Sequence, residues 1–305
     1  MSTRFPIAAL AAIAVLVAAC GATSPTPSNP TAPSGSGGPV ILPIPANNAF
    51  GVGDNRVIFT LTDSSGTKQV AGPDRSLSIG YHGPNGETIP AAPQTFIWAI
   101  EGVNGVYIGH TTFPSAGQWT ADFTTAAPSA PTQTTTFRFD VRDKLEVVSP
   151  GDPAPSVKTP TLADVGGDVT KVSTDATPVK RFYETSEADA LAAKEPFVLI
   201  FATPKFCKST VCGPTLDKLK PVAAAHPEMT FINVEPYQLK LVDGQLQPVL
   251  NGTDLVPVDA TTAFKLDAEP YVFVVGADGK VSSSFQLVFS PEEIEAAIQK
   301  VEKPA

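Results

Sequence analysis

The chain is short of positive charge, of histidine and of cysteine. Its 305 residues carry 21 Lys and Arg against 30 Asp and Glu, a formal net charge of −9. Nucleic-acid binding requires a basic surface that neutralises phosphates, so this charge balance argues against it. With three His and three Cys, ligands for a zinc site are too few. We therefore expect no nucleic-acid partner, no metal and no cofactor.

A long apolar run is also lacking. The apolar stretch at 7–17 has the length of the core of a signal peptide and is too short to span a bilayer. It leads into Val17-Ala18-Ala19-Cys20, which resembles a bacterial lipobox, whose cysteine is lipidated and becomes the new N-terminus. The alternative is a plain signal peptide cut near Ala19. The lipobox implies a signal peptide at 1–20 and a membrane contact through lipid on Cys20.

Residues 21–39 are expected to form a disordered tether, because they are almost all Ser, Thr, Pro, Gly, Asn and Ala and have little apolar surface to bury. A lipid anchor followed by a tether predicts a cell-envelope location, on the outer face of the cytoplasmic membrane or in the periplasm. An odd cysteine count in an exported protein requires an explanation. If Cys20 carries lipid, Cys207 and Cys212 remain as a pair, which outside the cytoplasm persists as a disulfide or cycles between redox states.

Residues 40–145 contain no cysteine and no helical periodicity. Short alternating apolar runs recur between turn signals, and this spacing predicts a β-sandwich of six or seven strands without an inter-sheet disulfide. The pattern is similar to the immunoglobulin-like modules of bacterial surface proteins. The predicted strands are at 56–62, 76–81, 95–100, 106–110, 118–123 and 136–141.

Residues 146–179 read as a linker rich in Pro, Gly, Asp, Thr and Ser, with a few apolar residues able to contact a neighbouring domain, namely Val157, Leu162, Val165, Val169 and Val172. From 180 to 305, helical and strand patterns alternate. The continuous apolar run at 197–201 predicts a buried central strand. The predicted order is α-β-α-β-α-β-β-α, with elements at 188–194, 197–201, 214–225, 229–234, 259–266, 271–275, 281–288 and from 291 onward.

A cysteine pair between the first strand and the second helix of this order resembles the thioredoxin superfamily over residues 180–303. Phe206 directly precedes the first cysteine, and the second opens a helix as Cys212-Gly213-Pro214, with an internal proline further along. Glu269-Pro270 precedes the third strand, where the family has a cis-proline facing its cysteines. The resemblance implies an α/β thioredoxin-like domain at 180–305, following the all-β immunoglobulin-like sandwich. Its implied catalytic residues are Cys207 and Cys212, and its implied substrate-binding residues are Phe206, Glu269 and Pro270.

The spacing of the pair also restricts its geometry. Two cysteines five residues apart within one helix would have Cα atoms about 8 Å apart, whereas a disulfide needs about 4.4–6.8 Å. Cys207 is therefore expected on the loop and Cys212 at or near the helix start. A helix N-terminus favours the thiolate form, and Lys205 and Lys208 beside Cys207 act in the same direction.

The pair departs from the family pattern in three ways. Four residues separate the cysteines instead of two, the aromatic residue is Phe206 rather than Trp, and the position of the family's buried acid is apolar, being Phe201 or Ile200. A second alignment makes Cys212 the nucleophile and Cys207 its resolving partner. The residues leave both alignments open, and the more exposed loop position favours Cys207 as the attacking thiol.

These features predict an envelope thiol–disulfide oxidoreductase that acts on exported proteins carrying thiols or disulfides. The alternative is a non-enzymatic binding or scaffold lipoprotein in which Cys207–Cys212 is structural. A peroxiredoxin is disfavoured, because the chain has no Arg after Arg181. Copper delivery is disfavoured as well, because His226 is the only histidine after the pair. The oligomeric state is not predicted.

Overall fold

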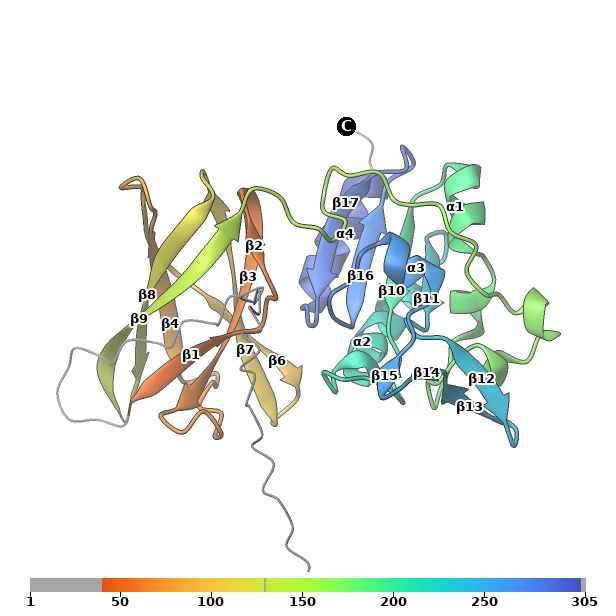
Figure 1. Ribbon diagram of the computed structural model, residues 1–305, viewed down its shortest axis with the longest axis horizontal. Helices are drawn as coiled ribbons and strands as arrows, with labels where there is room; N and C mark the ends of the chain where they lie inside the picture. The colour runs from red at the N-terminus through yellow and green to blue at the C-terminus, as the bar shows by residue number, and fades with distance from the viewer. Residues whose placement is uncertain (1–39, 129, 303–305) are drawn as a thin grey trace, which may run out of the picture.

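The computed structural model describes residues 40–128 and 130–302, and its architecture is rich in β-strands (Figure 1). The signal peptide, the lipidated Cys20 and the tether expected at 1–39 lie outside the described residues. Two bodies lie side by side, the first built from β1 to β9 and the second from the chain that follows β9. Within the described residues, no helix is long and apolar enough to cross a membrane.

The first body consists of two sheets packed face to face. One sheet has the order β1-β3-β7-β6, formed by β1 (Ile41–Pro45), β3 (Gly53–Asp63), β7 (Asn104–Phe113) and β6 (Thr95–Ile100). The other has the order β2-β9-β8-β4-β5, formed by β2 (Phe50–Gly51), β9 (Ala130–Arg142), β8 (Gly117–Ala127), β4 (Ser76–His82) and β5 (Thr88–Pro93).

Alternating side chains fill the space between these sheets. On β8, Trp119, Ala121 and Phe123 are buried while their neighbours are more exposed, as expected for a strand with one buried face. Trp119 meets Phe113 of the other sheet edge-on, with ring centroids 5.0 Å apart. The strands β1 and β5, which our prediction missed, each contain two prolines and lie at sheet edges, where a missing N–H costs no ladder hydrogen bond.

The second body has a four-stranded sheet with helices on both faces. Its order is β11-β10-β16-β17, from β11 (Thr230–Val234), β10 (Phe197–Phe201), β16 (Tyr271–Val275) and β17 (Val281–Gln286). The β10–β11 pair is parallel, and the other pairs are antiparallel. One face carries α2 (Cys212–Ala225) and α4 (Pro291–Glu302), and the other carries α1 (Glu187–Ala193) and α3 (Asp259–Ala263).

Most predicted elements of this body are present. The strands at 197–201 and 271–275 have the predicted bounds, while α2 begins two residues earlier than predicted, at Cys212. Four short strands between β11 and α3 were not predicted. They form two hairpins, β12 (Leu239–Val242) with β13 (Gln245–Pro248), and β14 (Leu250–Asn251) with β15 (Asp254–Leu255).

The segment at 146–179 is more ordered than the linker we predicted. It contains two short 3-10 helices, η1 (Ala163–Val165) and η2 (Val169–Lys171), and a third, η3 (Lys180–Tyr183), follows it. The predicted contacts of its apolar residues with a neighbouring domain are confirmed: Val157 packs against one core cluster of the second body, and Leu162, Val165, Val169 and Val172 against the other. The segment is therefore a packed part of that body.

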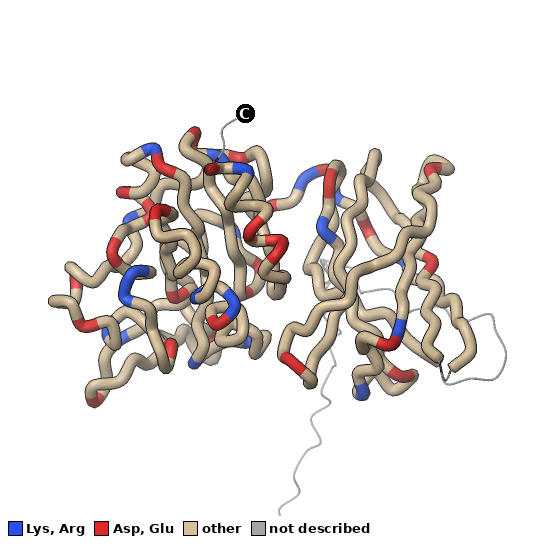
Figure 2. Tube along the Cα trace, turned by 180° about the vertical axis from the view of Figure 1, so that it is seen from behind, with Lys and Arg blue, Asp and Glu red and all other residues tan. Residues whose placement is uncertain are grey.

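The two bodies share an apolar interface. Ile58 and Ile108 of the first body are buried in one cluster with Val211 and Val288 of the second. Lys218 on α2 donates from Nζ to the backbone oxygen of Trp98, at 2.6 Å. Charged residues of both signs are interspersed over both bodies (Figure 2).

Candidate functional site

Cys207 and Cys212 form a disulfide, with their Cα atoms 6.0 Å apart. Cys212 is the first residue of α2 and is fully buried, whereas Cys207 lies in the preceding turn and is partly exposed. The predicted placement, loop for one cysteine and helix start for the other, is confirmed. Because disulfides persist outside the cytoplasm, the pair favours an extracytoplasmic location.

The sulfur of Cys207 accepts one hydrogen bond of the kind that stabilises a thiolate, from the backbone N–H of Cys212. The backbone N–H of Cys212 points at Cys207 Sγ, with 3.2 Å between nitrogen and sulfur, and the hydroxyl of Ser209 lies 3.3 Å from the same sulfur. Free N–H groups in the first turn of a helix are donors without an intrahelical partner, and hydrogen bonds to the charged form lower the pKa of a thiol. The helix start therefore supports the thiolate of Cys207 rather than that of Cys212.

The turn between the cysteines is tied to Glu269. The backbone N–H of Lys208 donates to Glu269 Oε1 at 2.7 Å, and Ser209 Oγ donates to the backbone oxygen of Glu269 at 2.7 Å. Thr210 completes the turn with φ +65°, a left-handed conformation that is uncommon for residues other than glycine. These contacts hold the turn between the cysteines in one conformation.

The Glu269–Pro270 peptide bond is cis and lies beside this turn. The buried carboxylate of Glu269 also accepts from Tyr237, whose hydroxyl is 2.6 Å from Oε2. Burial raises the pKa of Tyr237, and its hydrogen bond to Glu269 adds to the rise. The backbone oxygen of Pro270 accepts from the N–H of Leu287 at 2.8 Å. The backbone oxygens of Glu269 and Pro270, two residues predicted to bind substrate, are therefore already occupied within the chain.

Phe206, the third predicted substrate-binding residue, is partly exposed beside two exposed lysines. Lys205 Nζ lies 5.8 Å from the centre of the Phe206 ring, and Lys208 Nζ lies 5.3 Å from the centre of the Tyr237 ring. Cations next to a thiol favour its thiolate form. The structure thus gathers Cys207, Cys212 and Glu269 at one turn, with positive charge at its rim.

A buried carboxyl that sequence reasoning missed lies behind this turn. Glu235 directly follows β11, and its Oε1 accepts from the backbone N–H of Thr174 at 2.6 Å. Its Oε2 is buried without a hydrogen-bond partner among the described residues, and burial raises the pKa of Glu235 to about 7. The strand before Cys207 is apolar at Ile200 and Phe201 and carries no acid. The chain places one at the end of the neighbouring strand, where the polar Asn233 and Glu235 interrupt the apolar run.

Replacing Glu235 by Gln is expected to reduce the pH dependence of stability. Its folded-state pKa of about 7 is above that of an unfolded carboxyl, about 4.3. Because the pKa of Glu235 is higher in the folded than in the unfolded state, its contribution to the free energy of unfolding is full at acidic pH. That contribution is lost as pH rises through about 7. Urea unfolding of wild type should therefore show lower stability near pH 8 than near pH 5, and Glu235→Gln should narrow that difference. The exposed Glu195→Gln is the control, and an unchanged difference in Glu235→Gln would contradict the assignment.

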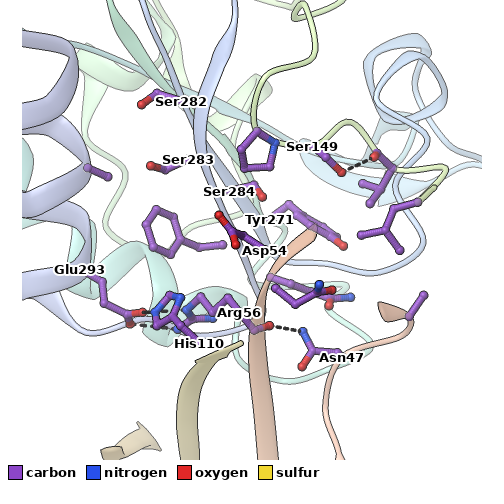
Figure 3. A pocket seen from close by; sticks show the side chains of 18 of the residues that line it. Asn47, Asp54, Arg56, His110, Ser149, Tyr271, Ser282, Ser283, Ser284 and Glu293 are labelled. Carbon is purple, nitrogen blue, oxygen red and sulfur yellow. Dashed lines mark hydrogen bonds and ion pairs between the residues drawn. The ribbon is translucent and has the colours of Figure 1, made fainter. Parts of the chain in front are cut away.

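A second candidate site is the cleft between the two bodies, with a volume of about 520 Å³ (Figure 3). It is lined by parts of β3, β7, β17, α4 and the segment that follows β9. Arg56 and Glu293 meet in it, and Arg56 Nη1 and Gln286 Nε2 are buried there without an acceptor among the described residues. Charges of both signs line the cleft, which therefore selects no single ligand charge. The charged residues are Arg56, Arg142, Lys265, Lys300, Asp54, Glu146, Asp267 and Glu293.

No protein family and no curated protein matches the chain. Among solved structures, a DUF4426 family protein from Pseudomonas aeruginosa PAO1 is similar at 13% identity and a TM-score of 0.27, over 37% of this chain and 98% of that one. The soluble domain of PmoD from Methylocystis sp. ATCC 49242 (Rockwell) is similar at 16% identity and a TM-score of 0.22, over 36% of this chain and 96% of that one. Such scores transfer neither a fold nor a function.

Proposed function

We propose that the protein is a thiol–disulfide oxidoreductase of the cell envelope, acting on exported proteins through Cys207 and Cys212. The observation that carries the proposal is the disulfide at the start of α2, which joins the partly exposed Cys207 to the buried Cys212. The strand order and the helices on both faces of the sheet support a thioredoxin-like second domain. The two facing sheets support an immunoglobulin-like first domain, and Val17-Ala18-Ala19-Cys20 supports a lipid anchor.

In the reductive direction, the Cys207 thiolate attacks one sulfur of a client disulfide. A Cys207–client disulfide forms, and the other client sulfur leaves as a thiolate. The thiolate of Cys212 then attacks Cys207 Sγ, which forms the Cys207–Cys212 disulfide and releases the second client thiolate. Two electrons pass from the protein to the client. The oxidative direction is the same sequence reversed.

The competing function is a binding or scaffold protein with a structural disulfide. The observation that favours it is the complete burial of Cys212 within a core cluster of the second body. A structural Cys207–Cys212 disulfide would stabilise the turn without taking part in thiol–disulfide exchange.

The reduction potential of the pair separates the two functions. We expect a value between about −120 and −270 mV, the range of exchanging pairs, whereas a structural bridge lies below about −300 mV. The protein is equilibrated in dithiothreitol buffers of graded ratio, and free thiols are counted by the mass added on alkylation. The Cys207→Ser/Cys212→Ser double variant supplies the background. A value below about −300 mV would leave the structural role standing.

A further inference from the structure

The insertion between β11 and α3, residues 237–256, is a small β-structure beside the cysteine turn. Its two hairpins are joined by backbone hydrogen bonds, from Gln238 N–H to the oxygen of Val256 and from Val249 N–H to the oxygen of Gln238. Tyr237 at its base donates to Glu269, which holds the cysteine turn through Lys208. The insertion is thereby fixed to the residues that position Cys207.

This insertion exposes apolar side chains that its own fold does not require. Leu241, Val242 and Leu250 are 48%, 41% and 53% exposed, and they are three of the six large apolar side chains that are exposed among the described residues. Leu246 of the β12–β13 hairpin is buried, so this hairpin packs on the second body through a different side chain. Exposed apolar side chains gathered on one small element are typical of interaction surfaces.

One face of the first hairpin reaches the cysteine turn. Val242 and Gln245 are cross-strand partners, so their side chains lie on the same face. Gln245 Oε1 accepts from Lys205 Nζ at 3.4 Å, and Lys205 lies two residues before Cys207. The surface from the cysteine turn to Val242 is therefore continuous.

On the side away from the insertion, the cysteine turn packs against the first body. Val211, which directly precedes Cys212, is buried in the interface cluster against Ile58 and Ile108 of the first body. A large partner therefore reaches the partly exposed Cys207 from the side of the insertion. Within the described residues β12 pairs with β13 alone, and β13 lies against η2, so β12 has the edge that could accept an extended strand.

Positive charge gathers at the cysteine turn and on β12, although the hairpins also expose Asp243 and Asp254. Lys205, Lys208 and Lys240 are exposed, and none of them forms an ion pair with a described residue. The chain as a whole has a net charge of −9. Unpaired cations around a reactive group attract partners of negative charge and speed their association.

We propose that the client surface, defined as Lys205, Phe206, Lys208, Lys240, Val242 and Leu250, docks an extended cysteine-bearing segment whose neighbours are apolar and acidic. The inference rests on the proposed function and names its substrate class. In the docked complex the client thiolate attacks Cys207 Sγ. A client–Cys207 disulfide forms, the Cys207–Cys212 bond breaks, and its electron pair leaves on Cys212 as a thiolate. The protein's own disulfide is the oxidant.

The test is a single-turnover rate measurement with oxidised protein and three blocked peptides, Asp-Leu-Cys-Leu-Asp, Lys-Leu-Cys-Leu-Lys and Gly-Gly-Cys-Gly-Gly. The rate of each peptide is divided by the rate at which β-mercaptoethanol opens the disulfide of the same variant. This ratio removes differences between variants in the intrinsic reactivity of the Cys207–Cys212 bond. We expect the acidic peptide to react about tenfold faster than the lysine peptide. Lys205→Glu/Lys208→Glu should reverse that order.

Two further variants separate the apolar contribution. Val242→Ser/Leu250→Ser should bring the rate of the acidic apolar peptide toward that of the glycine peptide. Val103→Ser, at a side chain 72% exposed in the first body, should change neither rate. Equal peptide rates in wild type and variants, with β-mercaptoethanol still reacting, would overturn the docking surface and leave the oxidoreductase standing. A disulfide that no thiol opens would overturn both.

Discussion

Cys212→Ser is expected to hold clients in a stable mixed disulfide, whereas Cys207→Ser should hold none. Cys207 is the partly exposed cysteine, and its sulfur receives the N–H of Cys212 at 3.2 Å. Cys212 is fully buried and suited to the second, internal step. Without Cys212 the mixed disulfide on Cys207 has no internal thiol to release it, so it accumulates.

The mixed disulfides are detected on non-reducing gels of envelope extracts, after both single variants have been expressed at equal levels. Bands that appear with Cys212→Ser and vanish on reduction identify clients by mass spectrometry. The Cys207→Ser/Cys212→Ser variant is the matched blank. Trapping by Cys207→Ser alone would instead make Cys212 the nucleophile, which is the second alignment that the sequence left open.

Glu293→Leu is expected to destabilise the protein by about 3–5 kcal/mol, because it leaves the charge of Arg56 without its partner. Arg56 Nε and Nη2 donate to the two oxygens of Glu293 at 2.7 and 2.9 Å, across the interface between the bodies. The side chains of Arg56 and Glu293 are only 10% and 20% exposed, so water does little to replace the contact. Breaking one side of such a pair costs far more than removing both.

Urea unfolding of Glu293→Leu and of Arg56→Leu/Glu293→Leu measures this cost. Glu293 also accepts from the N–H of Ser290 at the start of α4, and both variants lose that cap. The double variant also loses the Arg56 hydrogen bond to the Val288 oxygen and its contact with the Phe285 ring. It should still be the more stable one, because it leaves no unpaired charge. Lys144→Ala removes the exposed pair with Asp152 and should cost no more than about 1 kcal/mol. An equal loss of unfolding free energy in both Glu293 variants would contradict this prediction and mean that water in the cleft solvates Arg56.

Sequence patterns located the strongest elements and the cysteine geometry. The continuous apolar runs at 197–201 and 271–275 predicted the two central strands with the bounds observed, because both faces of those strands are buried. The five-residue spacing of the cysteines predicted a loop and a helix start, because no single helix allows the bridge.

Features that depend on the surroundings were not predictable from local pattern. The hairpins at 239–255 consist of strands of two to four residues with little alternation, so no periodicity marks them. Glu235 accepts a hydrogen bond from Thr174, which lies 61 residues away in the chain, and local sequence carries no sign of that contact. The segment at 146–179 has the composition of a linker, and its few apolar residues find their partners only in the folded body.

The packed segment at 146–179 makes the order of synthesis matter. It leaves the ribosome before any strand of the sheet that it covers. Its residues Leu162 and Val169 pack against a cluster that contains Ile294 and Ile298 of the last helix. Those apolar side chains have no partners until nearly the whole chain exists, whereas the strands of the first body are complete by Arg142. The first body can therefore fold while the chain grows, and the cysteine-bearing body only at the end. A chain cut short before α4 would leave the segment and the sheet as exposed apolar surface.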